Sequence, residues 1–472
     1  MSALPSFDDR ADFDSAERGF VAALTPGAIK AADGRVVWNS DAYAFLGAPG
    51  PDTADPGLWR QGRLCSKQGL FQVTEGIYQV RDLDLANISF IEGDSGVIVI
   101  DPLISTECAA AALSLYREQR GDRPVTAVIY THSHGDHFGG VRGVVPDGAS
   151  IPIIAPAGFL EHAVSENVYA GTAVTRRAVY LYGAELAGGE AGPTGGGLGI
   201  TTSTGTISLI PPTLDITRSG QEEVVDGVRI VFQLTPGSEE PSEMNSYFPD
   251  KRALCAAENA TPNLHNRLTV RGAVVRNPRT WTRYLTETIE MFGSETDVVF
   301  ASHHWPTWGR QQVKTFLTQQ RDLYAYLHDQ TLRLLNQGYT GVEIAEMIAI
   351  PPALERAWNT RGYSGSVGHH VKAICQHYLG WFDGNPTRRR ELPPVEAAKK
   401  HVEYMGGADA IIGKVKAEHD NPRWAVQVLN YVVFADPDNA QARELLTGVY
   451  ESLGHRASAD LEGRGYRTPV RE

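Results

Sequence analysis

The feature that most constrains this chain is a short segment crowded with side chains that can bind metal ions. The segment Thr-His-Ser-His-Gly-Asp-His spans residues 131–137 and directly follows the apolar run 125–130. Imidazole and carboxylate groups are the usual nitrogen and oxygen ligands of zinc and similar ions. Histidines placed by chance in a polar loop are the alternative, but three histidines and one aspartate within six residues favour a metal site. Gly135 is predicted to let the backbone turn, so that Asp136 and His137 face a second position.

The residues around this segment alternate between strand and helix patterns, which predicts an α/β layered fold. The apolar run 125–130 is predicted to be a short buried strand. The runs 88–90 and 97–100 flank a turn that contains glycine and aspartate, and they predict a hairpin. Residues 108–119 predict a helix with Thr106 as its cap. Further elements are predicted as strands at 228–234, 244–248, 253–257 and 298–301 and as a helix at 281–292.

The remaining metal ligands are expected at strand ends, because ligand sites of open α/β sheets gather there. Glu239 follows the strand 228–234, and Glu258 follows the strand 253–257. Since a carboxylate after an apolar run is costly unless it is paired or bound to metal, Glu258 is a candidate ligand. Spacing alone leaves the choice among Glu239, Glu240 and Glu243 open. His303 closes the strand 298–301 and is a candidate ligand, and one of the adjacent pair His303 and His304 could instead support a ligand or lie in the core.

Composition narrows the classes of protein to which the chain can belong. The chain has 472 residues, of which 42% are apolar and 21% charged, so it can bury a large core. Its net charge of −13 argues against a main role in binding nucleic acid or an anionic membrane. The apolar runs are shorter than the ~20 residues that span a bilayer. The beginning of the chain shows no signal peptide, and the four cysteines form no C-x-x-C pair, so a cytoplasmic location is expected.

Three regions are expected along the chain. Residues 1–60 are polar and weakly periodic, and they predict an N-terminal arm. Residues 61–312 carry the α/β pattern and the metal ligands. Residues 313–472 are dominated by helical periodicity, and the part from 423 to 452 resembles one tetratricopeptide-like hairpin that needs neighbours to pack against. The glycine-rich stretch 183–199 is interpreted as a cover over the active site.

These motifs resemble the metallo-β-lactamase superfamily and, more narrowly, its alkyl sulfatases. The resemblance covers about residues 55–460 and is carried by the stretches 69–102, 129–142, 154–159, 235–237, 257–261, 301–308 and 380–386. It implies an αββα sandwich followed by an all-helical dimerisation domain, and therefore a homodimer. Family members that act on long-chain detergents usually carry a third, sterol-carrier-like domain. The sequence stops at Glu472, just past the helical part, so either the sequence is truncated or the protein lacks this domain, and a preference for long alkyl tails is not implied.

The family also implies a ligand set and a chemistry. Two zinc ions per chain are expected, one held by His132, His134 and Glu239 and the other by Asp136, His137 and His303, with Glu258 as the bridge. The resemblance thus selects Glu239 over its neighbours. Manganese or iron would also suit a site that is this rich in carboxylates. Asp136 and Glu258 are the expected catalytic residues, because they hold the ions that activate water to hydroxide.

The substrate implied by the resemblance is an alkyl sulfate, which is hydrolysed to alcohol and inorganic sulfate. The matching positions for sulfate binding are Asn266 and Arg271, and an arginine fork suits a tetrahedral anion. Attack at sulfur and attack at carbon with inversion are both compatible with this ligand set. His265 and His304 are candidate proton donors for the first of these. His369 and His370, in the helical part, are expected to have core or surface roles.

Two other functions remain alternatives. One is another hydrolase of the same superfamily, such as a lactonase, thioesterase or lactamase. The other is a metal-stabilised scaffold without catalysis, whose helical half binds partner proteins. A nuclease of the superfamily is disfavoured by the acidic composition. The intact ligand set favours an enzyme over a scaffold.

Overall fold

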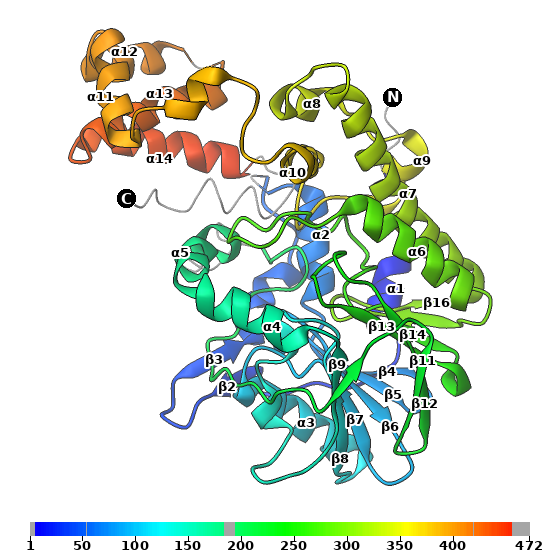
Figure 1. Cartoon of the computed structure of the whole chain (residues 1–472). Helices are drawn as coiled ribbons and strands as arrows, with labels where there is room; N and C mark the ends of the chain where they lie inside the picture. Colours follow the sequence, from blue (N-terminus) through cyan, green and yellow to red (C-terminus); the bar gives the residue numbers. More distant parts are fainter. Residues whose placement is uncertain (1–4, 53, 184–193, 419, 456–472) are drawn as a thin grey trace.

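The computed structural model describes residues 5–52, 54–183, 194–418 and 420–455 (Figure 1). Two β-sheets pack face to face through a core that includes Ile98 and Ile129 from one sheet and Phe232 and Phe248 from the other. Helices cover the outer face of each sheet and bury a second and a third core. The αββα sandwich followed by helices, which was predicted from the sequence, is therefore confirmed.

The first sheet has eight strands, in the order β1 (Phe20–Ala22), β4 (Gly69–Thr74), β5 (Ile77–Arg81), β6 (Ile88–Glu92), β7 (Val97–Ile100), β8 (Val125–Ile129), β9 (Ile153–Pro156) and β10 (Leu214–Ile216). The second has six, in the order β11 (Gln221–Val225), β12 (Val228–Leu234), β13 (Met244–Phe248), β14 (Ala253–Cys255), β15 (Val298–Phe300) and β16 (Thr307–Trp308). A separate hairpin joins β2 (Ala28–Lys30) and β3 (Val36–Asn39). The predicted hairpin is β6 and β7, which pair antiparallel.

Helices alternate with strands up to Trp308 and replace them beyond it. They are α1 (Ala11–Glu17), α2 (Pro56–Cys65), α3 (Thr106–Arg120), α4 (Phe159–Val164), α5 (Gly171–Tyr182), α6 (Pro278–Phe292), α7 (Arg310–Leu335), α8 (Gly341–Met347), α9 (Pro352–Glu355), α10 (Val367–Leu379), α11 (Pro394–Tyr404), α12 (Ala408–Ala417), α13 (Pro422–Ala435) and α14 (Ala440–His455). Short turns are η1 (Ser40–Gly47), η2 (Gly135–His137), η3 (Val141–Gly143), η4 (Ser165–Tyr169), η5 (Pro249–Lys251), η6 (Trp358–Thr360) and η7 (Pro386–Arg390). Among the residues described, no helix is both long and apolar enough to cross a bilayer.

The N-terminal residues are built into the catalytic half of the molecule. Strand β1 pairs antiparallel with β4 and forms the edge of the first sheet. Phe13 of α1 is buried beside Leu64 of α2 and Trp305. An ion pair of 2.9 Å between Arg60 and Asp12 joins the same two helices. The predicted arm thus lies against the sheet that carries the metal-ligand segment.

The start of α3 differs from the prediction. Thr106 is the first residue of the helix, and Ser105 is the residue before it. Neither caps the helix through its side chain. The Ser105 hydroxyl instead accepts a hydrogen bond from the Ser203 hydroxyl at 2.8 Å, because residues around 203 fold back over this end of the helix.

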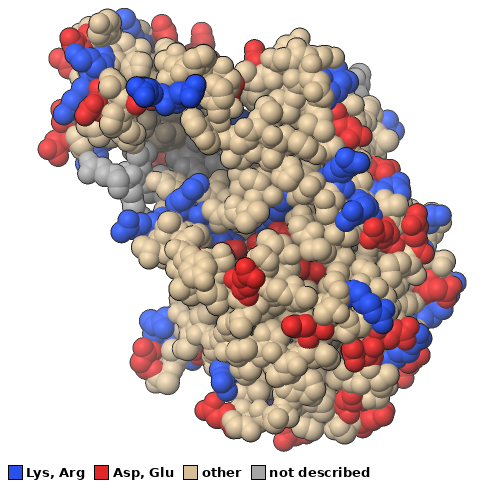
Figure 2. Space-filling view, viewed as in Figure 1, with Lys and Arg blue, Asp and Glu red and all other residues tan. Residues whose placement is uncertain are grey.

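The described helices from α7 onward take part in several separate cores. Helix α7 packs on α6 and shares a core with the second sheet, where Val313, Leu317 and Tyr324 are buried with Leu254 and Trp281. The last four helices, α11 to α14, bury a core of their own that includes Ile411, Leu429 and Leu446. The tetratricopeptide-like hairpin predicted at 423–452 corresponds to α13 and α14, which pack together, with α11 packed on α13. Charged residues of both signs are interspersed over the face shown in Figure 2.

Two histidines at the start of α10 make stability depend on pH. Burial lowers the pKa of His369 from 6.5 to about 4, and burial also lowers the pKa of His370 well below its ordinary value. The folded chain therefore holds both as neutral imidazoles, whereas the unfolded chain lets them take up protons below pH 6.5. Since the unfolded state then binds more protons, stability falls as pH falls from 6.5 towards 4.

We expect His369→Gln to remove part of this acid sensitivity. At about pH 5 the shift at His369 is worth about 2 kcal/mol of unfolding free energy, and at neutral pH almost nothing. Urea unfolding of the parent and the variant at both pH values measures the difference. A variant that loses as much stability as the parent on acidification would show that His369 does not carry the effect.

Candidate active site

The metal-ligand segment begins where β8 ends in the first sheet. Strand β8 runs parallel to β7 and β9, and the chain leaves it at Tyr130. Residues Gly135–His137 then form the turn η2. Gly135 is not among the residues with positive φ, and a Cβ there would meet only the Asn167 side chain at 3.9 Å. The prediction that this turn needs a glycine is therefore wrong, because the backbone conformation is open to other residues.

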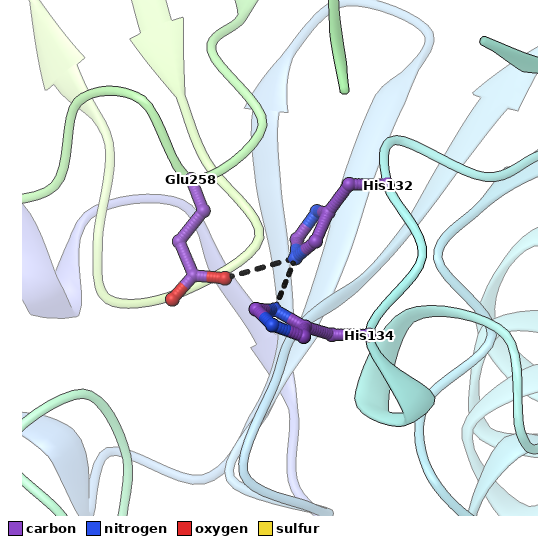
Figure 3. Close-up of side chains that lie close together, drawn as sticks. All are labelled: His132, His134 and Glu258. Atoms are coloured by element: carbon purple, nitrogen blue, oxygen red, sulfur yellow. Dashed lines mark hydrogen bonds and ion pairs between the residues drawn. The ribbon is translucent and has the colours of Figure 1, made fainter. Parts of the chain in front are cut away.

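Figure 3 shows the first group of predicted ligands. The Nε2 atom of His132 lies 3.2 Å from Oε2 of Glu258 and 3.0 Å from Nδ1 of His134. Glu258 follows β14 after a turn in which Ala257 adopts the left-handed φ of 47°. This conformation is uncommon outside glycine and is held here by backbone bonds between 256–257 and the end of β15. It brings Glu258 to the histidines of the other sheet.

The second group adjoins the first through the same carboxylate oxygen. Oε2 of Glu258 lies 3.3 Å from Nε2 of His137 and 3.4 Å from Nε2 of His303. Oδ2 of Asp136 lies 3.2 Å from Nε2 of His137 and 3.5 Å from Nε2 of His303. Glu258 therefore stands between the two groups, in the place where a bridging ligand is expected.

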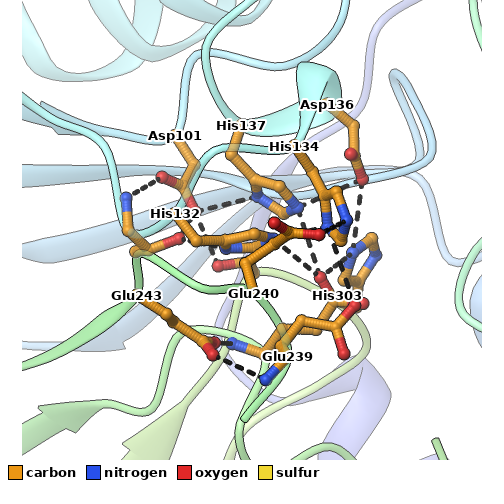
Figure 4. A network of polar contacts seen from close by, with 12 residues as sticks. Asp101, His132, His134, Asp136, His137, Glu239, Glu240, Glu243 and His303 are labelled. Atoms are coloured by element: carbon orange, nitrogen blue, oxygen red, sulfur yellow. Dashed lines mark hydrogen bonds and ion pairs between the residues drawn. The ribbon is translucent and has the colours of Figure 1, made fainter. Parts of the chain in front are cut away.

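The three neighbouring glutamates after β12 occupy different positions (Figure 4). Oε1 of Glu239 lies 3.6 Å from Nδ1 of His134, the nitrogen that faces His132. Oε1 of Glu240 lies 2.5 Å from the opposite nitrogen, Nε2 of His134. Glu243 faces away from the histidines and accepts hydrogen bonds from the backbone N–H groups of Glu239 at 3.0 Å and Glu258 at 3.4 Å. Only Glu239 thus reaches the nitrogen cluster from the side of the other ligands.

Each histidine is also held through the ring nitrogen that points away from the cluster. Nδ1 of His132 contacts the Thr131 hydroxyl at 3.0 Å, and Nδ1 of His303 contacts the Leu85 carbonyl at 3.2 Å. Nδ1 of His137 lies 3.0 Å from Oδ2 of Asp101. Such outer contacts fix the orientation of histidine ligands. The sequence analysis missed Asp101, although its position after β7 and before a proline marks it as the end of a buried strand.

The charges of the cluster suit divalent cations. Burial opposes ionisation of Asp136, yet the adjacent His137 holds the pKa of this carboxyl well below its ordinary value. Burial opposes charging of His303, but Glu258 and then Asp136 raise its pKa to about 9. Nε2 of His137 and Nε2 of His303 are buried without a hydrogen-bond partner. Converging imidazole and carboxylate groups with unused lone pairs fit metal ions at both positions.

The two predicted sulfate-binding residues lie on the loop that follows Glu258. Asn266 donates a hydrogen bond to the Ser364 hydroxyl at 3.3 Å and accepts one from Arg276 at 2.9 Å. Arg271 pairs with Glu166, whose other oxygen lies 3.7 Å from Nε2 of His134. The structure thus places Arg271 beside the first group of ligands, whereas the Asn266 side chain is engaged within the loop.

Two further arginines anchor this loop, and no local sequence pattern marks either of them. Arg276 pairs with Glu239 and also contacts Nε2 of His265 at 3.0 Å. Arg267 is fully buried, with its guanidinium carbon 3.3 Å from the ring centre of Trp281 and 3.5 Å from that of Tyr324. Stacked arginine contacts of this kind are favourable and hold the loop against α6 and α7.

The two candidate proton donors lie in different surroundings. Nε2 of His265 faces the site and lies 3.0 Å from Glu239 and 3.2 Å from Glu258. His304 instead contacts the Gly197 carbonyl at 3.0 Å through Nε2, and burial lowers its pKa to about 3. His304 is thus a neutral core histidine. Gly197 belongs to the glycine-rich stretch, of which residues 184–193 lie outside the described residues.

Two family models match the chain. The metallo-β-lactamase superfamily matches residues 81–303, which include every predicted metal ligand. The alkyl sulfatase dimerisation family matches residues 340–471, which include α8 to α14. The first match and the His/Glu clusters together indicate that the chain binds a divalent metal.

Several alkylsulfatases resemble the whole chain. A linear primary-alkylsulfatase from Pseudomonas sp is 48% identical over 480 residues, covering 100% of this chain and 71% of the relative. An alkyl/aryl-sulfatase from Saccharomyces cerevisiae is 47% identical, covering 98% of this chain and 72% of the relative. The solved structure of a stereoselective inverting sec-alkylsulfatase from Pseudomonas sp. superposes with a TM-score of 0.96 at 45% identity, covering 98% of this chain and 74% of that one. The fold, the ligand cluster and these matches together show that the chain belongs to the alkylsulfatases of the metallo-β-lactamase superfamily.

Proposed function

We propose that this protein hydrolyses alkyl sulfate esters to alcohol and inorganic sulfate with two zinc ions per chain. The observation that carries the proposal is a cluster of seven ligand-type side chains in which Glu258 contacts three of the histidines, in a chain 48% identical to a linear primary-alkylsulfatase. His132, His134 and Glu239 would hold one ion, and Asp136, His137 and His303 the other, with Glu258 between them. When bound, such ions lower the pKa of a shared water and stabilise negative charge.

The residues of the chain supply binding and orientation. Arg271 offers a planar fork of donors to the sulfate oxygens, and Asn266 adds a neutral donor once its amide turns from Ser364. Asp136 accepts a hydrogen bond from the attacking water and orients it. Glu240 and Asp101 keep His134 and His137 in their binding orientation. A lactonase or thioesterase has no need of an arginine fork for a tetrahedral anion, so the sulfatase is the better supported of the hydrolases.

We propose further that water attacks the carbon atom and that the C–O bond breaks. Sulfate is then the leaving group, and a weak base of this kind needs no proton donor. This fits a site in which His304, one of the two candidate donors, faces the Gly197 carbonyl. It also fits the inverting relative, since inversion requires attack at carbon.

Removal of a ligand is expected to abolish sulfate release. His134→Ala should lower sulfate release from linear alkyl sulfates by more than about 100-fold. Loss of a residue that only orients a ligand costs up to about 100-fold, and this variant removes a ligand itself. A chelator should have the same effect on the parent chain, and added zinc should reverse it. His162→Ala, which changes a histidine outside the cluster, is the matched control. Full activity of His134→Ala or of the chelated chain would refute metal-dependent hydrolysis.

The bond that breaks can be read from isotope incorporation. When the reaction runs in water enriched in heavy oxygen, we expect the label in the alcohol and none in the sulfate. Mass spectrometry of both products measures this. Label in the sulfate would instead establish attack at sulfur, and His265 would then become the leading candidate for the proton donor.

We also propose that the helices matched by the dimerisation family pair two chains. Large apolar side chains are exposed in this part, with Trp381 72% and Tyr404 87% accessible.

Sedimentation equilibrium should give twice the chain mass of 51.4 kDa. The double variant Trp381→Glu, Tyr404→Glu should weaken the dimer if these side chains are buried in it. Trp424→Glu changes a third exposed aromatic residue, and comparison with it tests whether the weakening is specific to Trp381 and Tyr404. A monomer at all concentrations would refute the dimer.

A further inference from the structure

A third group of ligand-type side chains lies beside the two metal positions. It consists of His134, Glu166 and Glu240. Glu240 already takes the outer nitrogen of His134 at 2.5 Å, whereas the nearer oxygen of Glu166 is 3.7 Å away. Glu166 pairs instead with the guanidinium of Arg271. A third cation would have to displace this arginine, so the group is better understood as an ion pair at the rim of the metal cluster.

The position of Glu166 is unusual for a charged residue. It lies on η4, a single π-helical turn between α4 and α5, and such turns are frequent at functional sites. Only 14% of the Glu166 side chain and 12% of the Arg271 side chain are exposed. Since solvent screens buried charges poorly, both act at nearly full strength on an ion bound beside them.

The ion that Arg271 binds changes its charge during the reaction. A sulfate monoester carries one negative charge, whereas the inorganic sulfate released at neutral pH carries two. An unpaired arginine would attract the product about twice as strongly as the substrate, because Coulomb energy scales with charge. Such an enzyme would be inhibited by its own product. A carboxylate next to the arginine offsets this, because it repels the doubly charged ion more.

We propose that Glu166 reduces the preference of the anion site for doubly charged sulfate over the singly charged ester, so that the product leaves. The inference rests on the proposed function for the identity of the two anions. Glu166 acts through its charge on whatever Arg271 holds, and it takes no part in bond breaking. The charge of Glu240 also acts on Arg271, but the direct contact of Glu240 is with His134, whereas Glu166 contacts Arg271 itself.

The test compares the binding of two anions to the zinc-loaded protein by calorimetry. A linear alkyl sulfonate is singly charged and is not hydrolysed, and inorganic sulfate is doubly charged. We divide the dissociation constant of sulfate by that of the sulfonate. In Glu166→Gln we expect this ratio to fall by at least about tenfold, because one negative charge near the ligand is removed. In steady-state kinetics of this variant, the inhibition constant of sulfate should fall by a larger factor than the KM for an alkyl sulfate.

Three variants make the outcome specific. Glu161→Gln removes the same charge from an exposed position of α4 and should leave the ratio unchanged. Glu166→Asp keeps the charge and should keep the preference of the parent. Arg271→Gln should weaken the binding of both anions, which shows that they occupy this site. An unchanged ratio in Glu166→Gln, or anion binding that does not depend on Arg271, would overturn the inference.

This measurement is independent of the proposed activity. If the parent chain released no sulfate from any alkyl ester, the proposed function would fail, whereas the ratio of dissociation constants would still decide the role of Glu166. If the parent is active and the ratio does not change, only the role of Glu166 fails.

Discussion

Mutual repulsion among buried carboxylates is the constraint on which the rest of this structure depends. Asp136, Glu239, Glu240 and Glu258 lie within one cluster, and three of them are almost fully buried. Such groups cannot stay ionised together unless positive charge is placed among them. Histidines, Arg276 and the metal ions implied by the fold supply that charge. The two sheets act as a frame, in which the second sheet supplies the three glutamates and the first sheet supplies Asp136 and most of the histidines.

The frame also explains why the outer contacts matter. The two carboxylate oxygens of Glu243 accept hydrogen bonds from the backbone N–H groups of Glu239 and Glu258. Burial, together with the carboxylate of Glu239, raises the pKa of Glu243 to about 8. The backbone of two predicted ligands is thus fixed by a third acid that never reaches the metal. Asp101 plays the equivalent part in the first sheet, where it contacts Thr131, His137 and Ser302. Both sheets therefore end in a buried acid that ties the ligand loops together.

The sequence was sufficient for the parts of this arrangement that leave a local signature. The strands predicted at 228–234 and 244–248 match β12 and β13, because apolar runs bounded by turn residues fix both ends. The segment 131–137 predicts a metal site by itself, because three histidines and one aspartate lie within six residues. Only the family resemblance selects Glu239 over Glu240 and Glu243 as a metal ligand. The three residues differ in the direction in which the loop orients their side chains, and a sequence pattern does not show this direction. Glu166, Glu240 and Arg276 are isolated charges in sequence, and only the fold shows what they face.

The packing of α7 has a consequence for how this architecture can be rebuilt. This helix shares its core with the second sheet, and its Tyr324 stacks on Arg267, which anchors the loop that follows Glu258. A chain cut before α7 would expose that core and release the loop, so the helix is inseparable from the active site. The last four helices bury a core of their own beyond the segment 380–393. The terminal bundle is therefore a separate packing unit, whose core shares no residue with the core beneath the active site.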